Sequence, residues 1–171
     1  MKKVLVAYAT AAGSTAEIAE VIGAELRTVG HKVDVVRCKK VDTVAGYDGI
    51  VIGSGVRAHK TYAEANRFGQ ANAKALLETP VALFVSCGAM KEGSDEGTAR
   101  AQGYADGLAA QVPGLSPVSV GLFPGAVDFD RMSWLFKMIL KKGFNETGGD
   151  YRDWDFIRGW AEELGAAFES A

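Results

Sequence analysis

The stretch that most constrains the fold of this chain is residues 4–19, where an apolar strand leads through a loop of very small side chains into an amphipathic helix. Five of the six residues from Thr10 to Thr15 are Thr, Ser or Ala, and the sixth is Gly13. No side chain in this loop is large enough to keep an anion away from the backbone. Because a helix N-terminus offers unpaired N–H groups and a partial positive charge, the sequence predicts a phosphate-binding loop at residues 10–15.

The residues present exclude two familiar kinds of phosphate loop. A Walker loop needs a Lys after its second Gly, and there is none between Lys3 and Arg27. A dinucleotide-binding loop needs the pattern G-x-G-x-x-G, and Gly13 stands alone. A neutral set of hydroxyls and amides remains, which suits a single terminal phosphate. The alternative interpretation is an ordinary helix start, with Ser14 as N-cap and Glu17 completing a capping box.

Strands and helices alternate along the whole chain. Strands are expected at residues 3–8, 31–37, 49–54, 81–86 and 118–123, and helices at 15–29, 62–77, 95–111 and 153–168, with a short turn near 41–45. The first, third and fourth strands are continuously apolar, as strands covered on both faces are. With right-handed crossovers, this order predicts an α/β fold with a doubly wound, five-stranded parallel sheet of order 2-1-3-4-5 in one domain, residues 1–171.

This architecture also predicts where a ligand binds. In open parallel sheets the ligand lies beyond the carboxyl ends of the strands, at the switch point between strands one and three. The loops there, residues 9–15, 54–61 and 86–95, are rich in small and polar residues. The candidate binding residues are Thr10, Ala11, Ala12, Gly13, Ser14, Thr15, Ser54, Gly55, Val56, Arg57, Ser86, Cys87, Gly88, Ala89 and Gly93.

Composition and charge narrow the class of protein. Apolar residues make up 48% and charged residues 23% of the chain, as in an ordinary globular domain. The net charge of −2 gives no overall attraction to nucleic acid, and no apolar run is long enough to cross a membrane. Cys38 and Cys87 form no metal-binding spacing, so no metal site is expected, and two unpaired thiols favour a reducing cytoplasm.

The loop at residues 10–15 resembles the phosphate loop of flavodoxins. Thr10, Gly13 and Thr15 match its pattern of hydroxyl residue, any residue, Thr, Gly, any residue, Thr, and Ser14 stands where Asn is frequent. Ala12 departs from the pattern by removing one hydroxyl. The two later loops look like the ring-binding loops of the same proteins. The resemblance implies that the cofactor is FMN.

A second resemblance covers essentially the full chain. Residues 124–150 form an insertion before the last helix that a minimal flavodoxin lacks, and Gly53-Ser54-Gly55-Val56-Arg57 comes earlier. This layout is similar to the flavodoxin-domain family that contains the menaquinone-dependent protoporphyrinogen dehydrogenases. It implies an FMN-dependent oxidoreductase that oxidises protoporphyrinogen IX with a quinone as acceptor. Arg57 and His59 are then the catalytic candidates, Arg57 for a substrate carboxylate or reduced flavin and His59 for a proton.

Two features of the sequence bear on substrate and location. Residues 131–142 carry four cations and no acid beside a broad apolar surface, so this segment either touches a membrane surface or lipidic substrate, or packs on the domain. In the first case the protein would sit at the inner face of the membrane. Residues 86–95 contain no aromatic to cover a flavin ring, which favours a bulky flat substrate. Phe129 could reach the ring from the insertion.

The sequence leaves two alternative functions to consider beside an oxidoreductase. One is a small flavodoxin that carries single electrons between protein partners, although such carriers are often strongly acidic and this chain is nearly neutral. The other is a response receiver without flavin, which needs an acidic cluster after the first strand. The residues Ala7-Tyr8-Ala9-Thr10 supply none.

Overall fold

The computed structural model describes residues 1–127 and 149–171. The strands at the centre of its sheet are the ones with continuous apolar sequences. Strands β1 (Lys3–Ala9), β3 (Gly49–Arg57) and β5 (Val81–Cys87) are buried along most of their length. β2 (Lys32–Arg37) and β6 (Ser119–Pro124) lie outside them, in the order β2-β1-β3-β5-β6. All four pairings in this path are parallel, which confirms the predicted fold class and strand order.

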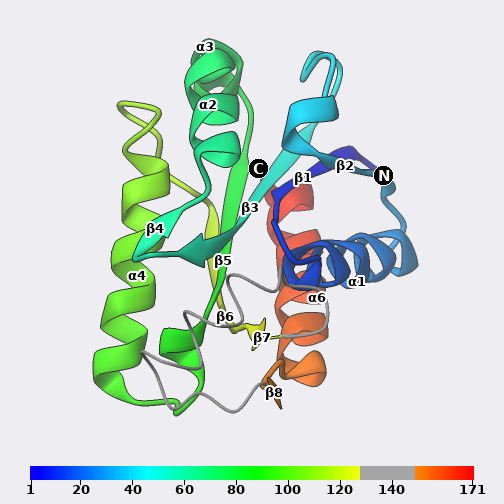
Figure 1. The fold of residues 1–171 in the computed structure, drawn as a ribbon. Helices are drawn as coiled ribbons and strands as arrows, with labels where there is room; N and C mark the ends of the chain where they lie inside the picture. Colours follow the sequence, from blue (N-terminus) through cyan, green and yellow to red (C-terminus); the bar gives the residue numbers. More distant parts are fainter. Residues whose placement is uncertain (128–148) are drawn as a thin grey trace.

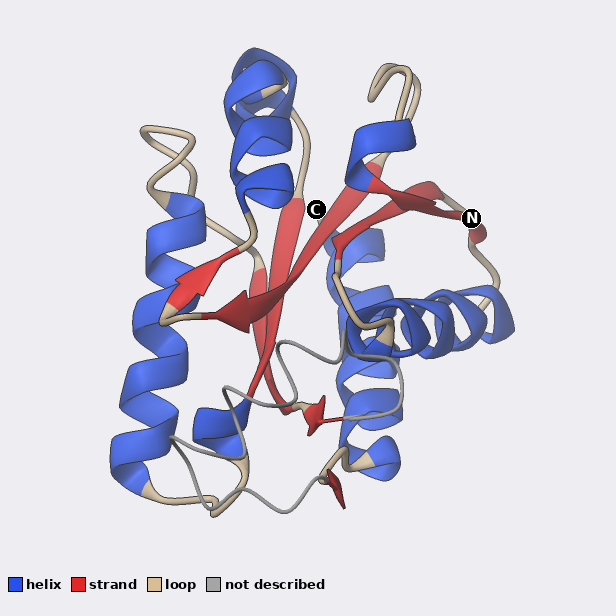
Figure 2. Cartoon of the chain, in the orientation of Figure 1, coloured by secondary structure: helices blue, strands red, loops and turns tan. Residues whose placement is uncertain are grey.

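Helices cover both faces of the sheet (Figures 1 and 2). On one face α1 (Ser14–Thr28) and α6 (Trp154–Ser170) pack on Val4, Val6, Val51 and Phe84. On the other face α2 (Ala63–Ala71), α3 (Ala73–Glu78) and α4 (Asp95–Ala109) cover the remaining strand side chains. Two apolar layers of this kind explain why β1, β3 and β5 carry no alternating polar pattern.

Several boundaries differ from the sequence-based expectation. The helix expected at 62–77 is divided at Asn72, whose side-chain Nδ2 donates to the Phe68 carbonyl at 2.9 Å. The turn expected near 41–45 is preceded by a short 3₁₀ helix, η1 (Cys38–Lys40). A second 3₁₀ turn, η2 (Gly88–Met90), follows β5, and β4 (Lys60–Thr61) adds an antiparallel hairpin to β3.

The ends of the predicted insertion are joined by a small ladder. β7 (Ala126–Val127) pairs antiparallel with β8 (Gly149–Asp150). The last helix then begins where the sequence places it, because Asp153 accepts a hydrogen bond from the Phe156 N–H at 2.9 Å as its N-cap. The intervening residues 128–148, which include Phe129 and the basic segment 131–142, lie outside the described residues.

Candidate functional site

The predicted phosphate loop connects the carboxyl end of β1 to the first turn of α1. Gly13 is the N-cap and has φ +96°, a left-handed conformation that suits glycine. Thr10 Oγ1 accepts a hydrogen bond from the Gly13 N–H at 3.0 Å, so the loop closes on its own first residue. Glycine brings no side chain to compete for the N–H groups of the first turn, which suits the binding of an anion.

The alternative of an ordinary capping box is wrong. Ser14 is the first residue of α1 rather than its N-cap, and the N-cap makes no side-chain hydrogen bond. The Glu17 carboxylate pairs with Arg152, with Oε2 2.6 Å from Nη1. The first turn is therefore organised by the loop backbone and not by a reciprocal side-chain cap.

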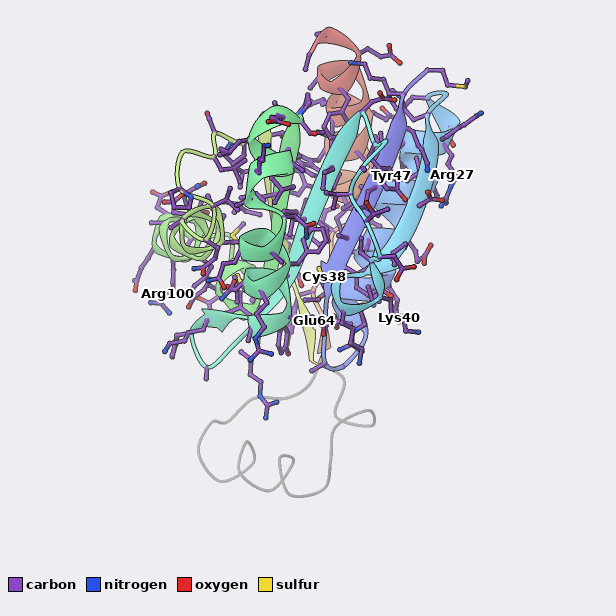
Figure 3. The ribbon with its side chains drawn as sticks, turned by 90° about the horizontal axis from the view of Figure 1, so that it is seen from above. Arg27, Cys38, Lys40, Tyr47, Glu64 and Arg100 are labelled. Carbon is purple, nitrogen blue, oxygen red and sulfur yellow. The ribbon has the colours of Figure 1, made fainter. Side chains whose placement is uncertain are left out.

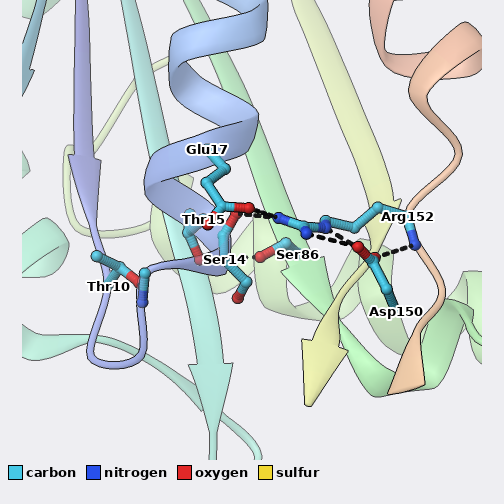
Figure 4. Close-up of polar contacts among 8 residues, drawn as sticks. Thr10, Ser14, Thr15, Glu17, Ser86, Asp150 and Arg152 are labelled. Atoms are coloured by element: carbon cyan, nitrogen blue, oxygen red, sulfur yellow. Dashed lines mark hydrogen bonds and ion pairs between the residues drawn. The ribbon is translucent and has the colours of Figure 1, made fainter. Parts of the chain in front are cut away.

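The structure brings the three predicted loops together at one edge of the sheet. In the parallel register Ala9 lies opposite Ser54, and Gly55 lies opposite Ser86, so the loops after β1, β3 and β5 start side by side. A buried contact of 3.0 Å joins Thr15 Oγ1 to Ser86 Oγ and links the first turn of α1 to the loop after β5 (Figure 4). This edge is the switch point at which a ligand is expected.

The loop after β3 is a tight hairpin with a strained tip. Arg57 pairs with Lys60, and the two residues between them, Ala58 and His59, have φ of 48° and 60°. A two-residue hairpin turn needs this left-handed conformation, which usually falls to Gly or Asn and costs a bulkier residue about 1 kcal/mol or more. The side chains at the tip, those of Arg57, His59 and Lys60, are exposed. His59 Nδ1 lies 3.2 Å from Tyr104 Oη.

The base of this hairpin is packed tightly against the first turn of α1. Ser54 is fully buried; its hydroxyl donates to the Gly55 carbonyl at 2.7 Å and accepts from the Tyr62 N–H at 3.0 Å. A Cβ at Gly55 would lie 2.8 Å from Thr15 Oγ1 and 2.9 Å from the Tyr62 ring. Glycine is therefore required here by close packing. The Ser54 side chain therefore organises the hairpin from within.

Tyr62 connects the same hairpin to the phosphate loop. Burial raises the pKa of its hydroxyl, while the Arg57 charge and the Ala11 backbone act in the opposite direction without cancelling that effect. The phenol therefore stays protonated at neutral pH and remains a neutral group beside the phosphate loop. The Tyr62 ring also lies close to Gly55, so it connects the hairpin base to the phosphate loop.

The loop after β5 follows two buried side chains and contains two glycines. Ser86 and Cys87 are buried, and burial raises the pKa of the Cys87 thiol, so the thiol is a small apolar group at neutral pH. A Cβ at Gly88 would meet no atom within 4 Å, and Gly93 has φ +61°. The loop therefore has space beside Gly88 and a turn that glycine favours at Gly93.

An ion pair that the sequence analysis did not single out supports the phosphate loop from β2. Arg37 Nη2 donates to the Thr10 carbonyl at 2.9 Å and to Glu64 at 2.9 Å, and its Nε donates to Glu64 at 3.0 Å. Burial alone would raise the pKa of Glu64, but the hydrogen bonds from Arg37 and the Lys39 N–H outweigh it and lower the pKa. Glu64 lies near Cys38 at this end of the sheet (Figure 3).

A second group of charges outside the predicted list lies on the other side of the loop. Arg152, two residues after the end of β8, reaches across to the first turn of α1 and contacts Glu17 and the Ser14 carbonyl (Figure 4). It also binds Asp150 through two nitrogens and stacks on Trp154, 4.5 Å from the ring centroid. Nearby, Lys91 of the loop after β5 lies 4.4 Å from the Tyr151 ring centroid.

The described part of the chain contributes little to other kinds of site. Within residues 1–127 and 149–171, His, Cys, Asp and Glu side chains form no group that would hold a metal ion. In the same residues, no helix has the length and apolar character needed to cross a bilayer. Both cysteines are free thiols and are buried.

The fold and this site define a flavodoxin-like flavoprotein of the oxidoreductase class. They combine a doubly wound parallel sheet, a neutral anion-suited loop after the first strand, and two glycine-bearing loops beside it. A family model described as a flavodoxin domain matches residues 5–153. The chain therefore belongs to the flavodoxin-domain family, as the resemblance of its loops predicts.

Several known proteins are similar to the chain over nearly its full length. Protoporphyrinogen IX dehydrogenase [quinone] of Escherichia coli is 24% identical, over 95% of this chain and 94% of that protein. The protein of the same name from Leishmania major is 26% identical, over 96% of this chain and 75% of its own length. Among solved structures, an archaeal flavodoxin (TM-score 0.62, 17% identity, 98% of this chain and 99% of that one) and Megasphaera elsdenii flavodoxin (0.61, 21%, 98% and 99%) share the fold.

Proposed function

We propose that the chain binds FMN, with the phosphate in the loop at residues 10–15 and the ring between the loops after β3 and β5. The observation that carries the proposal is the first turn of α1, where Gly13 in a left-handed conformation leaves the backbone open to an anion. The loop contains no Lys or Arg. Its backbone N–H groups and the hydroxyls of Thr10 and Ser14 would therefore supply the hydrogen bonds to the phosphate.

The residues around the loop fit a flat, phosphate-bearing cofactor. Gly88 leaves open space beside the backbone for the approach of a flat ring, and Thr15 braces the loop through Ser86 rather than projecting into solvent. Bound FMN supplies the hydride and electron chemistry, whereas the chain's own residues bind, orient and shield it. We assign residues 54–59 and 86–93 to the frame of the ring.

For the reaction, we propose oxidation of a reduced, carboxylate-bearing substrate with a quinone as acceptor. The hairpin tip places Arg57 directly opposite Lys60, so two cationic side chains lie close together where an anionic group of a substrate could bind. Protoporphyrinogen IX, a flat molecule with two carboxylates, suits such a tip, and the similar proteins of Escherichia coli and Leishmania major carry its name. Arg57 would bind a carboxylate in two-pronged fashion, and His59 would hold or receive a proton.

Cofactor binding is tested by titrating apo-protein with FMN and with riboflavin, which lacks the phosphate. FMN should bind at least tenfold more tightly, since charge-assisted hydrogen bonds to a phosphate contribute about 1.5–3 kcal/mol each. Thr15→Ala should weaken FMN more than riboflavin, because it removes the hydroxyl that links the first turn of α1 to Ser86. Equal affinity of the unaltered chain for the two flavins would refute the assignment of the phosphate loop.

The reaction is tested by mixing the oxidised flavoprotein with protoporphyrinogen IX in the absence of oxygen. Bleaching of the flavin absorbance, reversed by a quinone, is the expected result. Arg57→Ala should raise KM for the porphyrinogen more than it alters FMN affinity, with Arg67→Ala on the exposed side of α2 as a matched control. A flavin that stays oxidised here, yet exchanges electrons rapidly with a ferredoxin, would identify the chain as an electron carrier instead.

A further inference from the structure

Glu17 places a negative charge in the first turn of α1, next to the proposed phosphate site. It is the fourth residue after the N-cap Gly13, and its side chain is 44% exposed. A carboxylate in a first turn competes with a bound anion for the partial positive charge of the helix end, and it repels a phosphate directly. The chain therefore combines an anion-binding helix end with an anion of its own.

Arg152 holds this carboxylate from across the loop. Its side chain is 9% exposed, and its Nη1 lies 2.6 Å from Glu17 Oε2 and 3.4 Å from the carbonyl oxygen of Ser14. The other side of the guanidinium is fixed by Asp150, through Nε at 2.8 Å and Nη2 at 2.6 Å. The hydrogen bond and charge of Asp150, with those of Glu17, raise the pKa of Arg152 despite its burial, so the cation persists at any pH at which the protein functions.

The position of Arg152 is fixed before any ligand binds. Asp150 belongs to the β7–β8 ladder and also accepts a hydrogen bond from the Arg152 backbone N–H at 3.1 Å. The guanidinium stacks on Trp154, the first residue of α6. A side chain held on three sides loses little further entropy when it acts on a neighbouring charge. The contacts with Asp150 and Trp154 therefore hold the guanidinium in place more firmly than an ordinary surface ion pair is held.

We propose that Arg152 is a positioning residue of the phosphate site, which neutralises Glu17 and holds it aside so that the first turn of α1 accepts a dianionic phosphate. The inference rests on the proposed binding of FMN and deepens it. It concerns the difference between FMN and riboflavin, because only FMN carries the charge that Glu17 would repel. Loss of Arg152 would remove the guanidinium that contacts the carboxylates of Glu17 and Asp150 beside the loop.

The test is a double-mutant cycle on the ratio of FMN to riboflavin affinity, measured by flavin fluorescence quenching at low ionic strength. Arg152→Gln should lower the ratio about five- to tenfold, as expected for one charge acting through partly solvated protein. Glu17→Gln alone should raise the ratio or leave it unchanged. The double variant should recover most of the ratio lost in Arg152→Gln, because the repelling carboxylate is then absent.

Arg158→Gln provides a matched control. Arg158 also reaches from α6 to a carboxylate of α1, Glu25, at 3.5 Å. Glu25 lies eight residues after Glu17, roughly 12 Å further along the helix axis, so this pair cannot act on the phosphate site in the same way. The variant should leave the ratio unchanged, and thermal unfolding of each apo-protein would report any general loss of structure.

The outcomes separate the inference from the proposed function. If the unaltered chain binds FMN no better than riboflavin, the proposed phosphate site itself fails. If it prefers FMN, but Arg152→Gln weakens both flavins equally, Arg152 is a structural residue and the inference is overturned. The inference is also overturned if Glu17→Gln lowers the ratio of FMN to riboflavin affinity, because Glu17 would then assist phosphate binding. Glu17 is half-exposed, so this variant should fold even if Arg152→Gln does not.

Discussion

Replacing Arg37 by Met should lower the free energy of unfolding by about 2 kcal/mol at neutral pH. The substitution removes three charge-assisted hydrogen bonds to Glu64, two of them from Nε, and one to the Thr10 carbonyl. Breaking a fully buried ion pair costs about 3–5 kcal/mol. Here the two side chains are 33% and 20% exposed, so water screens part of the interaction and reduces that figure. For a chain of this length the expected fall in Tm is about 4–8 °C.

The effect should depend on pH in a direction set by Glu64. Its pKa is lowered below the ordinary value of 4.5, chiefly because the hydrogen bonds from Arg37 exceed the opposing effect of burial. A carboxylate with a lowered pKa contributes stability above its unfolded-state pKa, and this contribution is lost as the pH falls through the folded-state value. The difference between the unaltered chain and Arg37→Met should therefore be full at pH 7 and should shrink below about pH 4.

Urea unfolding followed by circular dichroism, at neutral pH and at successively lower pH, measures this difference directly. Arg27→Met is the matched control, because the exposed Arg27 donates only to the Val33 carbonyl, at 3.2 and 2.8 Å. It should lower stability by less than about 0.5 kcal/mol, with no dependence on acid. Equal losses in both variants, or a difference for Arg37→Met that stays constant into acid, would refute the role of the Arg37–Glu64 pair.

Three further outcomes are expected. Gly13→Ala should weaken FMN binding in calorimetric titrations and lower stability by about 1 kcal/mol, because its φ of +96° disfavours a side chain; unchanged FMN affinity would contradict this. Gly53→Ala should destabilise by about 1–3 kcal/mol, because the new Cβ would lie 2.0 Å from the Phe84 ring, and Phe84→Leu in the same chain should restore part of the loss in urea unfolding. The Cys38 thiol should resist iodoacetamide in the folded protein at mildly alkaline pH, because burial and the nearby Glu64 charge raise its pKa to about 12, so fast labelling without denaturant would show that the site opens.

The sheet could be predicted from the sequence because its signals are local. Strands that are covered on both faces must be apolar throughout, and β1, β3 and β5 are. The connection rules for parallel strands then leave few orders, and the order that the simplest rule favours is the observed one. The switch point follows from that order, so the location of the three loops also follows from the sequence.

The interruption between α2 and α3 illustrates where local patterning fails. Residues 62–77 have a helical pattern throughout, but Asn72 bonds to the Phe68 carbonyl through its side chain and adopts φ −111°. Such side-chain bonds compete with the helix, and their outcome depends on packing that the pattern does not contain. The capping-box alternative at Ser14 and Glu17 failed for a related reason, since the partner of Glu17 comes from more than a hundred residues away.

The charged residues around the phosphate loop could not be found from the sequence alone. Arg37 ends β2, and only the register that pairs it with Tyr8 brings it beside the loop after β1. Arg152 depends on the β7–β8 ladder for its position. The position of Arg37 could have been inferred from the strand order, because the last residue of a strand parallel to β1 lies at the edge of the sheet where the ligand is expected. The assignment of individual residues to FMN stays a prediction that the titrations above address.

The β7–β8 ladder has a consequence for how members of this family can diverge in length. Because Ala126 lies opposite Asp150, the residues that flank the intervening segment on either side are neighbours in space. Closing a loop whose ends already meet becomes only slightly less favourable as it lengthens, by about 0.6 kcal/mol for each doubling. The entropic cost of closing the segment between these two strands therefore places little restriction on its length.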